Sequence, residues 1–523
     1  MTKISPPPPA VDQTAGARVA AVLRAGPPAA GALPAATAMP APPAALILGN
    51  FINGRFVAPA AGAWLADVAP ATGEVIARVP RSDARDVNAA VQSARDAFPA
   101  WSRRPAEERL AILEDVAARI AAHAGELAAL ESLDTGKPLA LAASMDIPRA
   151  SLNFRFFAGA VRHDTTGCHE MSGALNYTLR RPLGVCALVT PWNLPLYLLT
   201  WKAAPALALG NTIVAKPSEL TPLTAAALCE IFSDAGLPAG VFNLIHGLGV
   251  EAGQPLVEHA GVRAVSFTGG TATGARVAAA AAPRFKKLSL ELGGKNPTVI
   301  FADCDFEAAV TGAARAGFHN QGQICLCGSR VLVEAPLHDR FVAALAARMS
   351  QLRLGDPSDP QTQLGALVSA AHRDKVESYV QLARSEGGVV IGGGRPILGP
   401  PFDRGAFLEP ALVTGLPPGC RTAQEEIFGP VVTVHPFADE AEAIAIANGV
   451  PYGLSASVWT RDLARAHRVA AALDVGMVWV NTWLVRDLRV PFGGTKESGV
   501  GREGGGYSLD FFSEQRNVCI QLD

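Results

Sequence analysis

Short, almost uniformly apolar runs separated by helical stretches follow one another from residue 184 onward. The runs are GVCALVT (184–190), NTIVAKP (211–217), VFNLIHG (241–247), AVSFTG (264–269) and KLSLELGG (287–294). Runs of this length that are apolar on both faces are typical of buried strands. Their alternation with helices indicates a parallel sheet that is covered on both sides. The pattern therefore predicts an α/β domain in this part of the chain.

A second series of the same kind begins at PTVIF (297–301) and continues past VWVNTW (478–483). Two other segments, ALNYTLRRP (174–182) and NVCIQL (517–522), alternate like antiparallel strands and fit neither series. We therefore predict an α/β fold with two parallel-sheet domains, which meet near residues 292–296, and a small antiparallel unit.

The first 45 or so residues differ from the rest of the chain, because PPPPA, AGPPAAGALPAA and MPAPPAA are rich in Pro, Ala and Gly. Such a composition buries too little apolar surface to order a core, so we predict a disordered tail over residues 1–48. Arg18 and Arg24, with few acidic neighbours, faintly suggest a transit peptide, whereas a continuous apolar region with a cleavage site, as in a secretory signal, is missing.

Composition narrows the classes of function. The 523 residues are 49% hydrophobic and 18% charged, with a formal net charge of −2. This balance provides no electrostatic footprint for nucleic acid or an acidic membrane surface. No apolar run reaches the roughly 20 residues of a membrane-spanning helix. The eight scattered cysteines do not form a disulfide framework, which favours a reducing cytoplasm.

A glycine-rich corner suggests a dinucleotide site. In FTGGTATG the predicted strand leads into Gly269, Gly270 and Gly274 at the start of a helix, where backbone N–H groups can approach a pyrophosphate. A plain tight turn is the alternative. Lys216 and Glu219, in KPSE, follow another predicted strand and could bind ribose hydroxyls. A carboxylate there repels a 2′-phosphate and so favours NAD over NADP.

Two polar residues at strand ends are candidates for catalysis. Glu291 interrupts an apolar strand, and desolvation there should raise its pKa towards that of a useful general base. The alternative is an ion pair with one of the neighbouring lysines, Lys286, Lys287 or Lys295. Asn193, in TPWNLP, could donate its side-chain N–H to an oxyanion, although turn-forming asparagines are commoner.

The segment NQGQICLCGS places Cys325 and Cys327 one residue apart in a glycine-flanked loop. The pair could be half a metal site, a redox couple, core filler, or a nucleophile with a bystander. Only His319 lies near enough to complete a zinc site, so we predict no metal. A disulfide between such close residues would be badly strained.

Seven motifs in the same order and spacing resemble the aldehyde dehydrogenase superfamily from about residue 49 to the C-terminus. They are TPWNLPLYLLTWK (190–202), AKPSE (215–219), FTGGTATG (267–274), LELGGKNP (290–297), NQGQICLCGSR (320–330), EEIFGP (425–430) and PFGGTKESGVGRE (491–503). The resemblance implies that Cys325 is the nucleophile and that Cys327 mostly contributes packing. Loop N–H groups and the nicotinamide cation should lower the pKa of the Cys325 thiol.

The resemblance also implies the remaining roles. Asn193 and the Cys325 N–H would stabilise the oxyanion, Glu291 would activate water to release the acid from a thioester, and Lys202 would join a proton relay. NAD would be the cofactor, and its contacts would be Trp192, Lys216, Ser218, Glu219, Gly269, Gly270, Gly274, Glu426 and Phe428. Gly270 departs from the family pattern, because many relatives have a serine that touches the pyrophosphate at this position.

The same resemblance implies the domain arrangement. The NAD-binding, Rossmann-like domain would comprise residues 49–158 and 183–293, and the catalytic domain residues 294–493. Residues 159–182 and 506–523 would form the antiparallel oligomerisation unit of a homodimer or homotetramer. No nucleic acid or membrane partner is expected.

Within the superfamily, DIPRASLNFRFFAG (146–159) and NTWLVRDLRVPFGG (481–494), among others, look most like the 2-aminomuconic and 2-hydroxymuconic semialdehyde dehydrogenases. These enzymes oxidise aldehydes that carry a distal carboxylate. Arg149 and Arg486 match their substrate-binding arginines, and a guanidinium suits a planar carboxylate. Arg155 and Arg489 are weaker candidates. For each arginine, an ordinary ion pair is the alternative.

Other readings of the sequence remain open. The substrate could be another aldehyde, such as betaine aldehyde or an aliphatic or aromatic aldehyde. A coenzyme A-acylating relative would not need the water-activating Glu291. A catalytically inactive binding protein would not need Cys325, Glu291 and Asn193 together.

Overall fold

The computed structural model describes residues 45–522, so most of the predicted tail lies outside the described residues. The end of that tail is ordered: Leu46–Ile47 form strand β1, which pairs in parallel with β5 (Val75–Pro80). The short apolar run ALILG explains this difference, because Leu48 is buried in the core. Strand β4 (Trp64–Val68) completes this three-stranded sheet.

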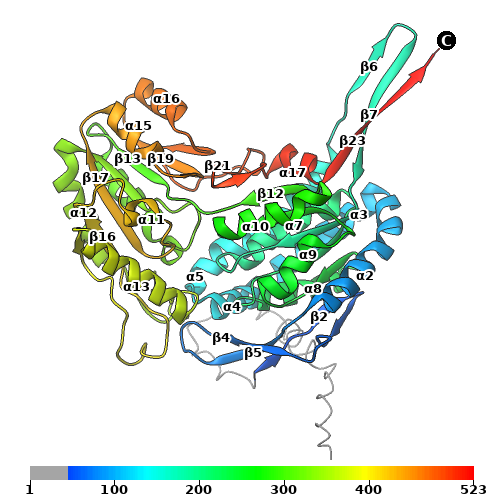
Figure 1. The fold of residues 1–523 in the computed structure, drawn as a ribbon, viewed down its shortest axis with the longest axis horizontal. Coiled ribbons are helices and arrows are strands. Elements are labelled where there is room, and N and C mark those ends of the chain that lie inside the picture. Colours follow the sequence, from blue (N-terminus) through cyan, green and yellow to red (C-terminus); the bar gives the residue numbers. More distant parts are fainter. Residues whose placement is uncertain (1–44, 523) are drawn as a thin grey trace, which may run out of the picture.

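An eight-stranded sheet forms the first of two α/β lobes (Figure 1). Its order is β22 (Gly499–Val500), β12 (Lys287–Glu291), β11 (Val262–Thr268), β8 (Val185–Val189), β9 (Thr212–Lys216), β10 (Phe242–Leu244), β2 (Asn50–Ile52) and β3 (Arg55–Val57). The five strands from β12 to β10 are parallel, whereas β22, β2 and β3 pair antiparallel at the edges. The parallel sheet predicted from the apolar runs is confirmed.

Both faces of this sheet are covered, which explains why its strands lack a polar face. In β8, Cys186 and Leu188 join the core formed with α7 and α8, whereas Val185 and Ala187 join the core formed with α2, α9 and α10. The helices and helical turns up to residue 284 are α2 (Ala84–Arg103), α3 (Ala106–Ala122), α4 (Ala124–Thr135), α5 (Leu139–Leu141), η1 (Ala142–Asp146), α6 (Ile147–Arg162), α7 (Pro195–Ala208), α8 (Leu223–Asp234), η2 (Gly249–Gly253), α9 (Gln254–Glu258), α10 (Thr271–Ala281) and η3 (Ala282–Arg284).

A seven-stranded sheet forms the second lobe. Its order is β15 (Val389–Ile391), β16 (Ala411–Thr414), β17 (Val431–Phe437), β14 (Arg330–Glu334), β13 (Pro297–Ile300), β19 (Ser455–Trp459) and β20 (Met477–Val480). All neighbours are parallel except β15 and β16. The helical elements after residue 300 are α11 (Phe306–Phe318), η4 (His319–Gly322), η5 (Ala335–Leu337), α12 (His338–Ser350), α13 (Ala370–Ser385), α14 (Arg421–Gln424), α15 (Glu440–Asn448), α16 (Leu463–Ala472) and α17 (Gly505–Phe511).

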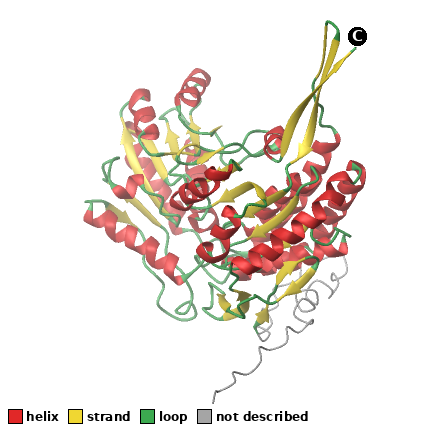
Figure 2. Ribbon diagram, turned by 45° about the vertical axis from the view of Figure 1, so that its right-hand side comes forward, coloured by secondary structure: helices red, strands yellow, loops and turns green. Residues whose placement is uncertain are grey.

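The two segments predicted as antiparallel strands pair with each other. Strand β7 (Ala174–Pro182) runs antiparallel to β23 (Ser513–Gln521) along its whole length and to β6 (Cys168–Met171) on its other side. The three strands project from the body of the molecule (Figures 1 and 2). The remaining pair, β18 (Tyr452–Gly453) and β21 (Thr495–Lys496), is a short antiparallel ladder. None of the helices among residues 45–522 has the length and apolar character needed to cross a membrane.

Candidate active site

Cys325 lies in a tightly held loop between η4 and β14. Asn320 and Gln321 have φ values of 51° and 56°, and Gly322 follows at +71°. A Cβ at Gly322 would lie 2.2 Å from the carbonyl oxygen of Gly429, so only glycine allows the loop to approach the EEIFGP segment so closely. Asn296 fixes the far side of the loop, because its Nδ2 donates to the Cys325 carbonyl at 2.7 Å.

The two cysteines of the loop occupy different environments. Cys327 is buried, with 5% of its surface exposed, in an apolar cluster with Ile324 and Trp483, whereas Cys325 is only partly buried. Burial raises the pKa of the Cys327 thiol to about 12. All eight cysteines are free. The geometry therefore agrees with a packing role for Cys327 and leaves Cys325 as the accessible sulfur.

The pKa of Cys325 corrects one expectation. Burial, followed by the charges of Glu291 and Glu426, raises this pKa, and Arg486 lowers it only in part. Among the described residues no backbone N–H donates a hydrogen bond to the sulfur, so the loop does not lower the pKa as predicted. The charges of Glu291, Glu426 and Arg486 therefore all act on the Cys325 thiol.

Asn193 reaches this loop from the other lobe. It follows β8 and is buried, and its side-chain Nδ2 donates to the Gln323 carbonyl at 2.9 Å. An amide nitrogen carries two hydrogens, so a second donor remains available. The side chain thus crosses to the cysteine loop, as an oxyanion donor must.

Glu291 ends β12 with 3% of its surface exposed, and neither carboxylate oxygen has a hydrogen-bond partner among the described residues. Burial, then the nearby Glu503 carboxylate, raises its pKa well above the usual value. The alternative of a lysine partner is wrong. Lys286 donates to the carbonyls of Val257 and His259, and Lys287 donates to those of Asp510 and Ser513. Lys295 Nζ has no hydrogen-bond partner among the described residues.

Lys202 is fully buried on α7 and forms an ion pair that the sequence reasoning missed. Its Nζ lies 2.7 Å from Glu503 Oε1 and donates to Ser266 Oγ at 2.9 Å. Both Lys202 and Glu503 act on the pKa of Glu291, which Lys202 lowers and Glu503 raises. Glu503 is the last residue of the PFGGTKESGVGRE motif, so its position in that motif was the available signal.

The glycine-rich corner follows β11 as predicted. Its three glycines differ in what a side chain at each position would contact. A Cβ at Gly274 would lie 2.4 Å from Leu292 Cδ2, so Gly274 permits α10 to pack closely against the residue that follows β12. A Cβ at Gly269 would meet the Phe267 ring at 2.5 Å. Gly270 caps α10 and faces open space. The first N–H groups of this eleven-residue helix have no partners within the helix, and they begin next to the uncrowded Gly270.

Lys216 and Glu219 lie beyond the carboxyl end of β9. Lys216 is buried and donates to Glu219 Oε2 at 3.3 Å and to the Pro217 carbonyl at 2.9 Å. Burial lowers the pKa of Lys216, and Glu219 opposes that shift. Ser218 Oγ accepts from the Leu220 N–H at 3.2 Å, so this side chain stabilises a local turn.

Glu426, Phe428 and Trp192 gather beside the cysteine loop. Glu426 accepts from the Gly294 N–H at 2.9 Å, and burial raises its pKa. The rings of Trp192 and Phe428 meet edge to face at 5.2 Å. His372, which the sequence reasoning missed, contacts the Phe428 carbonyl through Nε2 at 2.7 Å. This bond supports Phe428 in a backbone conformation with φ of 62°.

Arg149 and Arg486 are partly buried and lack acidic partners within residues 45–522. Arg149 Nε donates to Asn153 Oδ1 at 3.0 Å, but its Nη2 has no partner. Arg486 Nη1 contacts the Tyr197 hydroxyl at 3.3 Å, while its Nε and Nη2 have none. Both guanidinium groups lie over the Trp201 ring, at 5.3 and 5.4 Å from its centroid.

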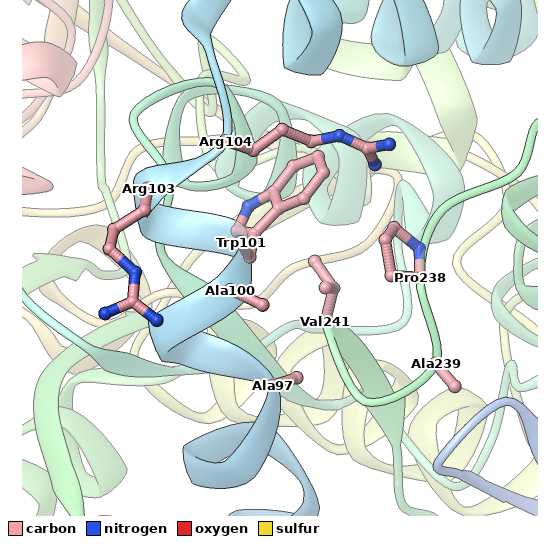
Figure 3. A pocket seen from close by; sticks show the side chains of 8 residues that line it. All are labelled: Ala97, Ala100, Trp101, Arg103, Arg104, Pro238, Ala239 and Val241. Atoms are coloured by element: carbon pink, nitrogen blue, oxygen red, sulfur yellow. The ribbon is translucent and has the colours of Figure 1, made fainter.

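The two weaker arginine candidates differ from this pair. Arg489 is exposed and forms a 2.6 Å ion pair with Asp487, and Arg155 is also exposed. A surface cavity of about 400 Å³ between α2 and the segment before β10 (Figure 3) is lined by other residues, including Trp101 and Pro238. None of the predicted site residues lines it.

Comparisons with known proteins agree with this geometry. The aldehyde dehydrogenase family pattern matches residues 56–518. The chain is 50% identical to 2-hydroxymuconic semialdehyde dehydrogenase of Pseudomonas sp. (strain CF600) over 90% of this chain and 99% of the relative. It is 48% identical to 2-aminomuconic semialdehyde dehydrogenase of Danio rerio, over 91% and 98%. Betaine aldehyde dehydrogenase from Staphylococcus aureus, solved in complex with NAD+, superposes with a TM-score of 0.89 at 38% identity, covering 91% and 95%. The chain therefore belongs to the aldehyde dehydrogenase family.

Proposed function

We propose that the protein oxidises a carboxylated, muconic-type semialdehyde to the dicarboxylic acid, with NAD as the hydride acceptor. The names of the most similar relatives support this substrate class. The observation that carries the proposal is the pair Arg149 and Arg486. Both side chains are partly buried, and both have buried nitrogen atoms without a hydrogen-bond partner among the described residues.

Buried cations without a counter-ion are costly, because removing a guanidinium from water loses its hydration. Burial, and then the charge of Arg486, lower the pKa of Arg149 to about 10, so Arg149 stays charged at neutral pH. A substrate carboxylate would supply the missing anion and accept from the free donors. Betaine aldehyde carries a positive charge, so the same arginines would repel it.

The nucleotide side fits NAD. The N-terminus of α10 at Gly270 offers N–H donors to a pyrophosphate, and Lys216 and Glu219 can bind ribose hydroxyls. Glu426, Phe428 and Trp192 would hold the nicotinamide end. NAD, when bound, accepts a hydride and brings a positively charged ring. That charge would offset the raised pKa of Cys325.

The chain's own residues account for the remaining chemistry. The Cys325 thiol loses its proton and its sulfur bonds to the aldehyde carbon. Asn193 Nδ2 and the Cys325 N–H would donate to the resulting oxyanion. Loss of hydride leaves a thioester on the sulfur. Glu291 then takes a proton from water, whose oxygen attacks the thioester and releases the acid and the thiolate. Lys202 and Glu503 would relay the proton away.

A direct assay tests the substrate. NADH absorbance should rise rapidly with 2-hydroxymuconic semialdehyde, and kcat/KM should exceed that for betaine aldehyde or a short neutral aldehyde. Coenzyme A should not change the rate, because the thioester is hydrolysed by water. Equal kcat/KM values for the acidic and cationic aldehydes would contradict the proposal. A rate that requires coenzyme A would identify an acylating enzyme instead.

We further propose a homodimer or homotetramer in the cytoplasm. The projecting sheet has open edges at β6 and β23 and exposes Met171 and Ile520, at 59% and 44%. Open edges with exposed apolar side chains tend to be covered by a partner. The eight free cysteines fit a reducing compartment. Light scattering at micromolar concentration should detect at least a dimer, and a monomer would refute the proposal.

A further inference from the structure

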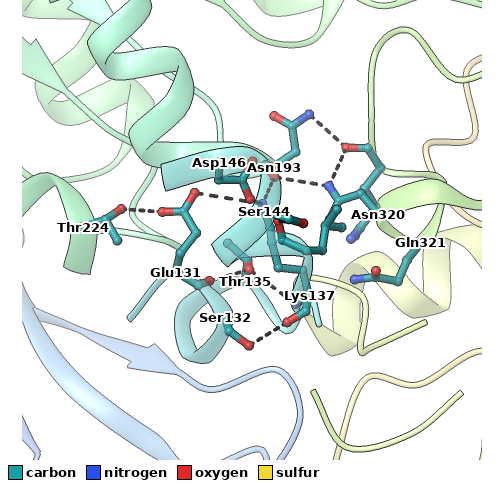
Figure 4. A network of polar contacts seen from close by, with 12 residues as sticks. Glu131, Ser132, Thr135, Lys137, Ser144, Asp146, Asn193, Thr224, Asn320 and Gln321 are labelled. Atoms are coloured by element: carbon teal, nitrogen blue, oxygen red, sulfur yellow. Dashed lines mark hydrogen bonds and ion pairs between the residues drawn. The ribbon is translucent and has the colours of Figure 1, made fainter. Parts of the chain in front are cut away.

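A buried lysine lies directly beneath the main chain of Asn193 (Figure 4). Lys137 Nζ donates to the Asn193 carbonyl at 2.9 Å and forms a 2.6 Å ion pair with Asp146 Oδ2. A second carboxylate oxygen, Glu131 Oε1, lies 3.9 Å away. The side chain of Lys137 is 1% exposed, and those of Asp146 and Glu131 are 0% exposed. The lysine is therefore shielded from solvent, and its ammonium is held by these three groups.

The end of helix α4 holds the backbone of Lys137 in place. Helix α4 ends at Gly136, whose φ of +76° reverses the chain, and Ser132 Oγ donates to the Lys137 carbonyl at 2.7 Å. Asp146 ends the π-helical segment η1, which continues directly into α6, the helix of Arg149. Lys137 thus links the start of α6 to the loop that carries Asn193.

The opposite side of Asn193 is bound to the cysteine loop. Asn320 Nδ2 donates to the Asn193 carbonyl at 3.3 Å, and Asn193 Nδ2 donates to the Gln323 carbonyl at 2.9 Å. The carbonyl oxygen of Asn193 therefore accepts one bond from Lys137 and one from the loop that presents Cys325. Since both lone pairs are used, rotation of this peptide would break two buried hydrogen bonds.

We propose that Lys137, held by Asp146, is a positioning residue that orients the Asn193 side chain towards the Cys325 loop. This inference rests on the proposed function, because it takes Asn193 as the oxyanion donor. A donor contributes to the rate only when it lies within hydrogen-bond reach of the developing oxyanion. Lys137 would set that position without touching the substrate.

The buried charges explain why the ion pair between Lys137 and Asp146 contributes more to the position of Asn193 than to the stability of the fold. A buried ion pair adds little net stability, because desolvation of both charges offsets their attraction, whereas removing one partner leaves the other unpaired. Burial raises the pKa of Glu131, which weakens this carboxyl group as a counter-ion. Its second oxygen is held by Thr224 Oγ1 at 2.8 Å. Asp146, at 2.6 Å, is therefore the main counter-ion of Lys137.

A double-mutant cycle on a short neutral aldehyde tests the inference. Lys137→Met should lower the single-turnover rate of NADH formation about ten- to a hundredfold, while the Kd for NAD and the KM for aldehyde change less than about threefold. Asn193→Ala alone should be at least as slow. In the Asn193→Ala background, Lys137→Met should cost less than about threefold, because the group it orients is gone. If Lys137 has a purely structural role, the fold-losses in rate of the two single variants should instead multiply in the double variant.

Two control variants and the activity of Asn193→Ala itself make the result decisive. Lys286→Met also removes a buried lysine that binds backbone carbonyls, and it should leave the single-turnover rate near that of the parent. Asp146→Asn keeps the side-chain volume and should reproduce the cycle with a smaller loss, even if Lys137→Met fails to fold. If Asn193→Ala is fully active, the oxyanion assignment fails. If Asn193→Ala is slow but the losses multiply, only the positioning role of Lys137 is overturned.

Discussion

Lys202 and Glu503 form a buried 2.7 Å ion pair whose two charges act in opposite directions on one carboxyl group, that of Glu291. The Glu503 carboxylate raises the pKa of Glu291 and the Lys202 ammonium lowers it. Burial is the largest cause and raises it further. Since a general base works only when deprotonated, deacylation should increase with pH through this raised pKa and fall as pH drops below it.

The first prediction concerns the acid limb of the pH profile, which is the range where the rate of deacylation rises as Glu291 loses its proton. Removing Glu503 and removing Lys202 should shift this limb in opposite directions. Glu503→Gln removes the charge that disfavours ionised Glu291, so the limb should move to lower pH. Lys202→Met removes the charge that favours it, so the limb should move to higher pH. The measurement is kcat against pH with a substrate for which deacylation limits turnover. A shift in the same direction for both variants would show that these charges do not tune Glu291.

The second prediction separates the two cysteines. Cys325→Ala should reduce activity by about a thousandfold or more, because no other sulfur can form the thioester. Cys327→Ala should keep kcat/KM within about threefold and lower stability by about 1 kcal/mol, since it only trims an apolar cluster. NADH formation and thermal unfolding of both variants test this. Comparable activity losses in two folded variants would contradict the assignment of Cys325 as the nucleophile.

The third prediction concerns the water-activating step. Glu291→Ala should still form one equivalent of NADH per subunit and then stall, since the thioester lacks its base. Steady-state turnover should fall about 10²- to 10⁴-fold. Mass spectrometry of the intact protein should detect the acyl adduct. Normal turnover without an adduct would leave Glu291 a structural residue.

The sequence was sufficient to predict the sheets and the loop that holds Cys325 and Cys327. Uniformly apolar runs such as GVCALVT require two covered faces, and β8 indeed packs against a different core on each side. Local chemistry also predicted the desolvation of Glu291, because its neighbours in the strand are apolar. By contrast, the strand at Leu46–Ile47 was missed, because a tail rich in Pro and Ala masked a two-residue signal.

Pairings between residues far apart in the sequence could not be predicted. Lys137 meets Asn193 across 56 positions, and Lys202 meets Glu503 across 301. No periodicity or spacing encodes such pairings, because they arise when two loops or lobes come together. The raised pKa of Cys325 was missed for the same reason, since it reflects the burial and acidic neighbours that the fold assembles.

The fourth prediction is that Arg149 and Arg486 select acidic aldehydes. A charge-assisted bond is worth about 1.5–3 kcal/mol, so Arg149→Ala and Arg486→Ala should each lower kcat/KM for a muconic semialdehyde about ten- to a hundredfold. A short neutral aldehyde should be oxidised at nearly the parental rate. Arg→Lys should rescue only partly, because an ammonium lacks the planar fork.

The control for this prediction must allow for a second effect of Arg486. Its charge also lowers the pKa of Glu291, so Arg486→Ala should shift the acid limb to higher pH. The substrates should therefore be compared above that limb, where Glu291 is ionised in every variant. Arg489→Ala, which removes an exposed arginine paired with Asp487, should leave the ratio of acidic to neutral kcat/KM unchanged. Equal losses on both aldehydes in Arg149→Ala and Arg486→Ala would mean that the two arginines stabilise the fold. The function would then reduce to oxidation of aldehydes without a preference for a distal carboxylate.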